Sequence, residues 1–310
     1  MTELSIIENF SEDLNQQESN QCTTGKAPGI LSPGIGEYLC THYLLLSHAE
    51  AVQIYRDDFQ KKQNGIISIV MDIAWSEPFD PNSDSDKDAA QRFKEFYYGW
   101  YANPVVYGDY PKVMKDYIGE KSKTQGFKKS RLPEFTLAEK IKLRGSFDFL
   151  GVNHYTCVLA ENVNLTDVSL YGDMNVKISF DPKWNRTLMA DFVNEPWSLN
   201  KTLVWIMKTY KNPVMYVTEN GIADDGKLDD VERENYLKGY IRATMDAISL
   251  GAKVKGYTYW SLLDNWEWLN GYTMHFGLVQ VDRSNSNLTR TIKRSGYYYK
   301  KIINNRSLDF

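Results

Sequence analysis

Short apolar runs that alternate with longer helical stretches constrain the fold of this chain more than any other feature. Four runs have the length and composition of buried strands and end in polar or aromatic residues: Ile66–Asp72, Phe147–Asn153, Val214–Thr218 and Val254–Trp260. Helical patterns lie between and around them, at Ile35–Lys62, Ala89–Tyr101, Leu199–Tyr210, Leu228–Leu250 and Thr291–Asn304. This order predicts an α/β fold of parallel βα units.

A helix before or after each later strand favours a (β/α) barrel over an open dinucleotide-binding sheet. Gly34-Ile35-Gly36 is the nearest approach to a dinucleotide loop, but no strand precedes it and the third glycine is absent. Ser32-Pro33 instead predicts a cap and a first-turn proline for the helix that follows. We therefore set the dinucleotide-binding interpretation aside and expect function at the carboxyl ends of the strands.

Charge and composition narrow the classes of partner. The 310 residues are 42% hydrophobic and 25% charged, as in soluble globular proteins, with a formal net charge of −4. Nucleic-acid and anionic-membrane surfaces favour clustered Lys and Arg, so we expect neither partner and a small neutral substrate instead. No apolar run reaches the roughly 18 residues of a membrane span, and Met1 to Asn20 lacks the apolar region of a signal peptide.

Cysteines and glycosylation sequons say little about the compartment. Cys22, Cys40 and Cys157 are widely separated and form no CxxC, so neither a disulfide framework nor a zinc site is indicated, and we expect buried thiols. Sequons begin at Asn9, Asn164, Asn185, Asn200, Asn287 and Asn305. They hint at a secretory ancestry, but the compartment stays unknown.

Three strand ends carry dense polar and aromatic groups: Asn153-His154-Tyr155, Thr218-Glu219-Asn220-Gly221, and Trp260 to Trp268 in the run WSLLDNWEW. A lone Glu219 after a strand is usually a solvated loop residue, and TENG alone is compatible with a turn that uses glycine at positive φ. A barrel would bring all three ends to one mouth. A carboxylate, a tyrosine hydroxyl and indole rings together suit the stabilisation and trapping of an oxocarbenium ion.

The motifs VTENG, YWSLLDNWEW and GYTMHFGLVQVD resemble the C-terminal signature of glycoside hydrolase family 1. Further segments follow in family order: Ala27-Pro28-Gly29, SPGIGEYLCTHYLLLSHAEA, WSEPFDP, GDYPKVM, SRLPEF and FDFLGVNHYT. The resemblance covers roughly Glu12 to Asn304. It implies a (β/α)8 TIM barrel, of which this chain holds roughly strands 4/5 to 8 as a single partial domain over residues 1–310, with residues 1–24 divergent or non-native.

The resemblance also implies a retaining β-glycosidase that needs neither metal nor cofactor. Glu219 is then the nucleophile that attacks the anomeric carbon, and Tyr155 orients it. The implied substrate-binding residues are Asn153, which shapes the pocket, Trp260 as the floor beneath the sugar ring, Glu267 and Trp268 for the sugar hydroxyls, and Phe276 as an apolar wall. For Leu262, Leu263 and Trp266 we expect core packing.

The general acid/base of the family lies in an Asn-Glu-Pro motif, and the family spacing before Ala27 places it at Glu12. There, Ser11 and Asp13 replace the asparagine and the proline, so Glu12 is a degenerate acid/base candidate. The literal Asn194-Glu195-Pro196 is interpreted as the entry to the next helix, with Asn194 as N-cap. The glutamine, arginine, histidine and tryptophan of the first three family strands have no counterpart upstream of Glu12.

Three functions follow as alternatives. The first is a β-glucosidase-like hydrolase of β-glucosides, β-galactosides or β-fucosides. The second is an inactive fragment or pseudo-enzyme that binds at most a sugar or a partner chain, and we favour it for this polypeptide taken alone. The third, a purely structural barrel, fits poorly because Glu219, Tyr155, Glu267 and Trp268 all remain. The natural aglycone and the oligomeric state do not follow from the sequence.

Overall fold

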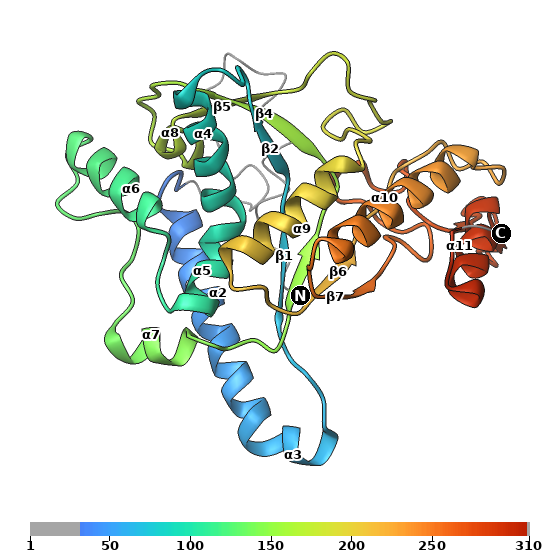
Figure 1. Cartoon of the computed structure of the whole chain (residues 1–310), viewed down its shortest axis with the longest axis horizontal. Helices are drawn as coiled ribbons and strands as arrows, with labels where there is room; N and C mark the ends of the chain where they lie inside the picture. The colour runs from blue at the N-terminus through green and yellow to red at the C-terminus, as the bar shows by residue number, and fades with distance from the viewer. Residues whose placement is uncertain (1–31, 309–310) are drawn as a thin grey trace. The chain divides into compact units, whose positions relative to one another are not determined.

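The computed structural model describes residues 32–308, and Figure 1 shows their helices and strands. The chain divides into two compact units. The first comprises the described residues up to Gly151 together with Val158–Asp181, and the second comprises Val152–Cys157 and the residues from Pro182 onward. The predicted separate segment at residues 1–24 lies outside the described residues, so the predicted domain division stays a prediction.

The first unit is mainly helical. Its helices are α2 (Gly36–Ile54), α3 (Gln60–Gln63), α4 (Asp84–Lys94), α5 (Trp100–Tyr107), α6 (Lys112–Thr124), α7 (Leu137–Leu143) and α8 (Leu170–Met174), and the π-helical turns η2 (Tyr55–Phe59) and η3 (Glu95–Gly99) join α2 to α3 and α4 to α5. The helical patterns predicted at Ile35–Lys62 and Ala89–Tyr101 are therefore confirmed as helical segments.

Side-chain caps define two of these helix starts. The hydroxyl of Ser83 accepts a hydrogen bond from the Asp86 amide at 3.2 Å, at the start of α4. Thr136 and Glu139 form a reciprocal capping box at the start of α7. These side chains satisfy amides that the first helical turn leaves without backbone partners.

The predicted side-chain cap at Ser32 is wrong. The helix α2 begins at Gly36, and the Ser32 carbonyl oxygen, not its hydroxyl, accepts hydrogen bonds from the Ile35 and Gly36 amides. A tight turn therefore satisfies these amides without a side chain. The expectation of buried thiols holds for Cys157 but is wrong for Cys40, which lies on the exposed face of α2.

The strands of the first unit form two small groups. The strand β1 (Ile69–Asp72) lies beside the first residues of β3 (Leu150–Asn153). A Cβ atom at Gly151 would lie 2.9 Å from Cγ2 of Val70, so glycine allows this close approach. A separate sheet has the order β2-β4-β5, formed by β2 (Trp75–Pro78), β4 (Cys157–Asn162) and β5 (Val176–Ser179).

The second unit carries the remaining elements: α9 (Trp197–Thr209), β6 (Met215–Glu219), α10 (Val231–Ser249), β7 (Val254–Tyr257), the 3₁₀ turn η4 (Trp268–Asn270), β8 (Val279–Val281), β9 (Arg290–Ile292) and α11 (Arg294–Asn305). Here the end of β3 is followed in the sheet by β6 and then β7, and β6 runs parallel to β7. The strands β8 and β9 pair separately as an antiparallel ladder.

The core of the second unit lies between this sheet and its helices. Leu203 on α9 and Leu237 on α10 are fully buried, as are Val152 and Val217 on the strands. Burial of apolar side chains such as these is the main favourable contribution to folding. The sheet and its two long helices therefore give the strand ends a rigid base.

The four predicted strands are confirmed in position, but most are shorter than predicted. The strand β1 begins at Ile69 instead of Ile66, and β7 ends at Tyr257 instead of Trp260. An apolar run marks residues that are expected to be buried, whereas a strand requires a partner ladder as well. Within residues 32–308, no helix combines the length and apolar character needed to cross a membrane.

Candidate active site

Glu219 and Tyr155 meet at the ends of two neighbouring strands of the second unit. Glu219 is the last residue of β6, and Tyr155 follows the end of β3. The Tyr155 hydroxyl donates a hydrogen bond to Oε2 of Glu219 at 2.6 Å. A backbone hydrogen bond from the His154 amide to the Glu219 carbonyl oxygen, 3.0 Å long, joins the same two strand ends.

Aromatic packing fixes the Tyr155 ring. It stacks on Phe192 with a centroid separation of 5.4 Å and meets Phe276 edge-on at 6.2 Å. Tyr155, Ala223 and Phe276 are buried together, and Trp260 packs against this cluster. The hydroxyl of Tyr155 is therefore held toward Glu219 by contacts on more than one side of its ring.

A second carboxylate lies beside Trp260. The indole Nε1 of Trp260 donates to Oε1 of Glu267 at 3.2 Å, and Glu267 is only 5% exposed. The Glu267 amide donates to the Gly271 carbonyl oxygen at 2.7 Å, which closes a tight loop. Trp268, the next residue, has a φ of 47° and is 41% exposed, so its indole faces solvent more than that of Trp260.

Asn153 is buried at the end of β3. Its Oδ1 accepts a hydrogen bond from the Thr218 hydroxyl at 2.7 Å, one residue before Glu219. The structure thus brings Asn153 to β6, as the predicted pocket requires.

The expectation of core packing is wrong for three residues of the loop after β7. Leu262 is 69% exposed, Trp266 61% and Leu263 39%. These residues follow the end of β7 and lie in irregular chain, where no strand or helix period directs an apolar side chain inward.

A buried network of charges, absent from the sequence predictions, holds the loops after β6 and β7. Arg233 on α10 is fully buried and forms ion pairs with Asp224 and Asp230, each at 2.5 Å. Lys293 is also fully buried and lies 3.3 Å from Oδ1 of Asp264 and 3.5 Å from Oδ1 of Asp224. Asp224 follows β6 and Asp264 follows β7, so this network ties both strand-end loops to α10 and the start of α11.

Both carboxylate oxygens of Glu195 accept hydrogen bonds just before the start of α9. Its Oε2 accepts a hydrogen bond from the indole of Trp197 at 2.7 Å, and its Oε1 accepts from the Asn185 amide at 3.0 Å. The helix starts at Trp197 after Pro196, and Asn194 is not its N-cap, so that prediction is wrong. The Glu195 and Pro196 carbonyl oxygens already accept from the first helical amides.

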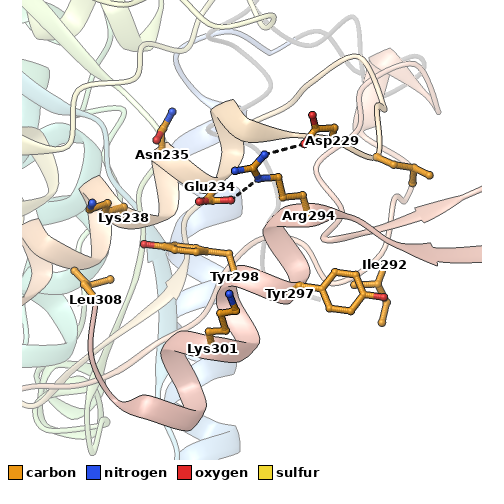
Figure 2. A pocket seen from close by; sticks show the side chains of 11 residues that line it. Asp229, Glu234, Asn235, Lys238, Ile292, Arg294, Tyr297, Tyr298, Lys301 and Leu308 are labelled. Atoms are coloured by element: carbon orange, nitrogen blue, oxygen red, sulfur yellow. Dashed lines mark hydrogen bonds and ion pairs between the residues drawn. The ribbon is translucent and has the colours of Figure 1, made fainter. Parts of the chain in front are cut away.

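The second unit also contains a cavity of about 760 Å³ between α10 and α11 (Figure 2). Arg294 lies on its wall and donates hydrogen bonds to Glu234 at 2.7 Å and to Asp229 at 3.1 Å (Figure 2). None of the predicted site residues within 32–308 lines this cavity. We therefore place the candidate site at Glu219, where a carboxylate, a phenol and an indole converge.

Two further sequence predictions concern the acid/base and a metal ion. Glu12 lies outside the described residues. Within residues 32–308, no group of three His, Cys, Asp or Glu side chains is arranged to hold a metal ion. The described residues provide a carboxylate fixed by a phenol, and an indole that packs against that phenol and bonds a second, buried carboxylate. These groups suit nucleophilic attack on a hydroxylated ring.

Comparison with known proteins shows which sequence family the chain matches. Residues 3–308 match the sequence model described as Glycosyl hydrolase family 1. The chain is 39% identical over 300 residues to the human (Homo sapiens) Lactase-like protein, covering 95% of this chain and 53% of that protein. It is also 39% identical over 279 residues to Myrosinase 1 of Brevicoryne brassicae, covering 89% of this chain and 60% of that protein.

Solved structures agree with these relatives. The chain is similar to an aphid myrosinase with a TM-score of 0.83 at 39% identity, over 87% of this chain and 59% of that one. It is similar to a β-glucosidase of the fungus Humicola insolens in complex with glucose, with a TM-score of 0.82 at 32% identity, over 90% and 59%. The chain thus spans between about half and three fifths of the length of these relatives.

Proposed function

Because this chain belongs to glycosyl hydrolase family 1, we propose that it carries the nucleophile, Glu219, of a retaining β-glycosidase. The observation that supports this proposal most directly is the 2.6 Å hydrogen bond from the Tyr155 hydroxyl to Oε2 of Glu219. It orients the carboxylate at the carboxyl end of a parallel strand, where barrel enzymes place their chemistry.

In the proposed reaction, a carboxylate oxygen of Glu219 attacks the anomeric carbon as the bond to the leaving group breaks. The product is a glycosyl-enzyme, which water then hydrolyses to regenerate the carboxylate. Tyr155 orients the carboxylate by donating a hydrogen bond to its Oε2. Trp260 supplies the floor beneath the sugar ring, and Phe276 supplies an apolar wall. Both pack in the same cluster as Tyr155.

Glu267 is proposed to accept hydrogen bonds from the sugar hydroxyls, because it is a buried carboxylate whose Oε1 is oriented by the indole of Trp260. Trp268 is proposed to donate its indole N–H to the same sugar. Asn153 is proposed to shape the pocket from the neighbouring strand. The substrate class is a β-glycoside, as suggested by the glucose complex of the Humicola insolens β-glucosidase.

We also assign β1, β3, β6 and β7, as a proposal, to the last four strands of an eight-stranded (β/α) barrel. Family membership supports that architecture, and the parallel pairing of β6 with β7 is consistent with it. In such a barrel, Glu219 and Tyr155 lie at the mouth formed by the carboxyl ends of the strands.

The nucleophile is tested by trapping with an activated 2-deoxy-2-fluoro-glycoside. Its leaving group needs no protonation, so trapping requires Glu219 but not Glu12. We expect a covalent adduct by intact-mass measurement, mapped to Glu219 by peptide sequencing. Glu219→Gln should abolish the adduct, whereas Glu195→Gln, the same change at a carboxylate bound by Trp197, should leave it. An adduct on Glu195 or Glu267 would contradict the assignment.

The acid/base step is tested by dependence on the leaving group. If Glu12 is a poor acid, aryl glycosides with acidic phenols should react far faster than alkyl glycosides. Equal rates on both classes would indicate an intact acid.

A second candidate function, carbohydrate binding without turnover, is favoured by the exposed indoles of Trp266 and Trp268, which can stack on sugars. Glycoside binding without adduct or hydrolysis would support it.

A further inference from the structure

Asn220, the residue after Glu219, is fully buried with every polar group of its side chain engaged. Its Nδ2 donates to the His154 carbonyl oxygen at 2.6 Å and to the Tyr236 hydroxyl at 2.8 Å. Its Oδ1 accepts from the Tyr257 hydroxyl at 2.6 Å. A carbonyl oxygen only accepts, so the atom that faces His154 must be the amide nitrogen, and this fixes the orientation of the side chain.

The amide of Asn220 replaces a rung of the parallel ladder. The His154 amide donates to the Glu219 carbonyl oxygen at 3.0 Å. In a regular parallel ladder, the His154 carbonyl oxygen would then accept from the amide of Gly221. Here it accepts from the side chain of Asn220 instead. The main chain is therefore able to leave the sheet directly after Glu219 while the two strand ends remain joined.

The same residue also holds Trp260. The Trp260 amide donates to the Asn220 carbonyl oxygen at 2.9 Å. Beside this bond, a Cβ atom at Gly221 would lie 1.8 Å from the Trp260 carbonyl oxygen, so the two main chains are in direct contact. Asn220 thus connects three segments, which carry Tyr155, Glu219 and Trp260.

We infer that Asn220 is a positioning residue, which sets Tyr155 and Trp260 relative to Glu219 through the bonds of its side chain and main chain. The catalytic consequence of this inference rests on the proposed function. The link between the three segments rests only on the hydrogen bonds of Asn220. Burial raises the pKa of Tyr236 and that of Tyr257 well above the ordinary value. Both phenols therefore keep their protons at neutral pH, which leaves the Tyr257 hydroxyl able to donate to Oδ1.

The test makes the same substitution, Asn to Asp, at two positions. Asn220→Asp keeps the size and an acceptor for Tyr257 but removes both donors. The control is Asn200→Asp on α9, where the lost amide bond is a 3.3 Å contact with the Ala243 carbonyl oxygen. Because a buried carboxylate at 220 can prevent folding, Tyr257→Phe serves as a second variant that removes only the hydroxyl that orients the amide.

Amide hydrogen exchange, followed by mass spectrometry, measures how firmly Asn220 holds the neighbouring segments, and it does not require enzyme activity. In Asn220→Asp, the segments around His154 and Trp260 should exchange at least about tenfold faster, and in Tyr257→Phe they should do so to a smaller extent. Asn200→Asp should leave both segments unchanged. Exchange in Asn220→Asp and Tyr257→Phe equal to that in the control would overturn the inference.

The rate at which the fluorinated glycoside traps Glu219 measures the effect of each substitution on the proposed reaction. The first-order rate of adduct formation should fall by about 10²-fold in Asn220→Asp, since misplacement of about 1 Å has effects of this size, while the glycoside concentration for half-maximal rate changes less. Faster exchange with an unchanged trapping rate would refute a positioning role. Absence of an adduct in the parent chain would contradict the proposed function instead. The hydrogen-exchange rates would then still test whether Asn220 joins the three segments.

Discussion

Replacement of Arg233 by methionine removes the main cation from the buried charge network behind the candidate site. The apolar stem is kept, but Asp224 and Asp230 lose the guanidinium that lies 2.5 Å from each of them. The carbonyl oxygens of Gly277 and His275 lose donors at 3.0 and 2.5 Å. Lys293 would still lie 3.5 Å from Oδ1 of Asp224, and Ser295 would still donate to Asp230.

The expected cost follows from the full burial of Arg233. Removing one partner from a buried ion pair costs about 3–5 kcal/mol, because the other charge is left uncompensated. Proteins are stable by about 5–15 kcal/mol, so this loss is a large share of the total. With a urea dependence of about 2 kcal/mol per M, the unfolding midpoint should fall by about 1.5–2.5 M.

Urea unfolding followed by tryptophan fluorescence measures this shift. The matched control is Arg294→Met, because Arg294 also bonds two carboxylates, Glu234 and Asp229, but its side chain is 49% exposed. Solvent and salt screen such pairs, so the control should show little change at physiological salt. Equal shifts in the two variants, or a midpoint for Arg233→Met close to that of the parent, would show that burial does not determine the cost.

Three further results are expected. Burial lowers the pKa of His48, whose Nε2 lies 2.7 Å from the Ser146 carbonyl oxygen. The unfolded chain therefore binds more protons between that lowered pKa and about 6.5, and stability should fall as pH drops through this window. His48→Gln should reduce the difference between urea midpoints at pH 7.5 and 5.5, and an unchanged difference would contradict this reasoning. Thr136→Ala should destabilise the chain by about 0.5–2 kcal/mol through loss of the capping box, measured by the same unfolding curves; a neutral result would mean that α7 frays without consequence. Leu262→Ala should change stability by less than about 0.5 kcal/mol, whereas Leu237→Ala should cost about 2–5 kcal/mol, because the first side chain is 69% exposed and the second fully buried; similar costs would refute the surface placement of Leu262.

The strands were predictable because local composition alone marks them. Leu150–Asn153 and Met215–Glu219 are apolar runs that end in polar residues, and the structure confirms both as neighbouring strands. The loop after β7 was predicted wrongly, because Leu262 and Trp266 lie in chain without a regular period, where apolar character does not reveal the direction of a side chain.

The candidate site was predictable only in part. Tyr155 and Glu219 lie 64 residues apart, and their contact was expected from the resemblance and not from spacing. Arg233 belongs to a charged helix and gives no sign of burial, because its partners Asp224 and Gly277 are brought to it by tertiary folding. The role of Glu12 stays a prediction.

The absence of space beside Gly221 bears on how relatives of this chain should be sorted. Any side chain there would collide with the Trp260 carbonyl oxygen, whether or not Glu219 performs a reaction. A relative without the nucleophile would meet the same collision if its main chain took this course, so shape alone favours glycine at this position. The glycine at 221 therefore reflects the shape of this strand end, whereas under the proposed function it is the pair Glu219 and Tyr155 that would separate active relatives from inactive ones.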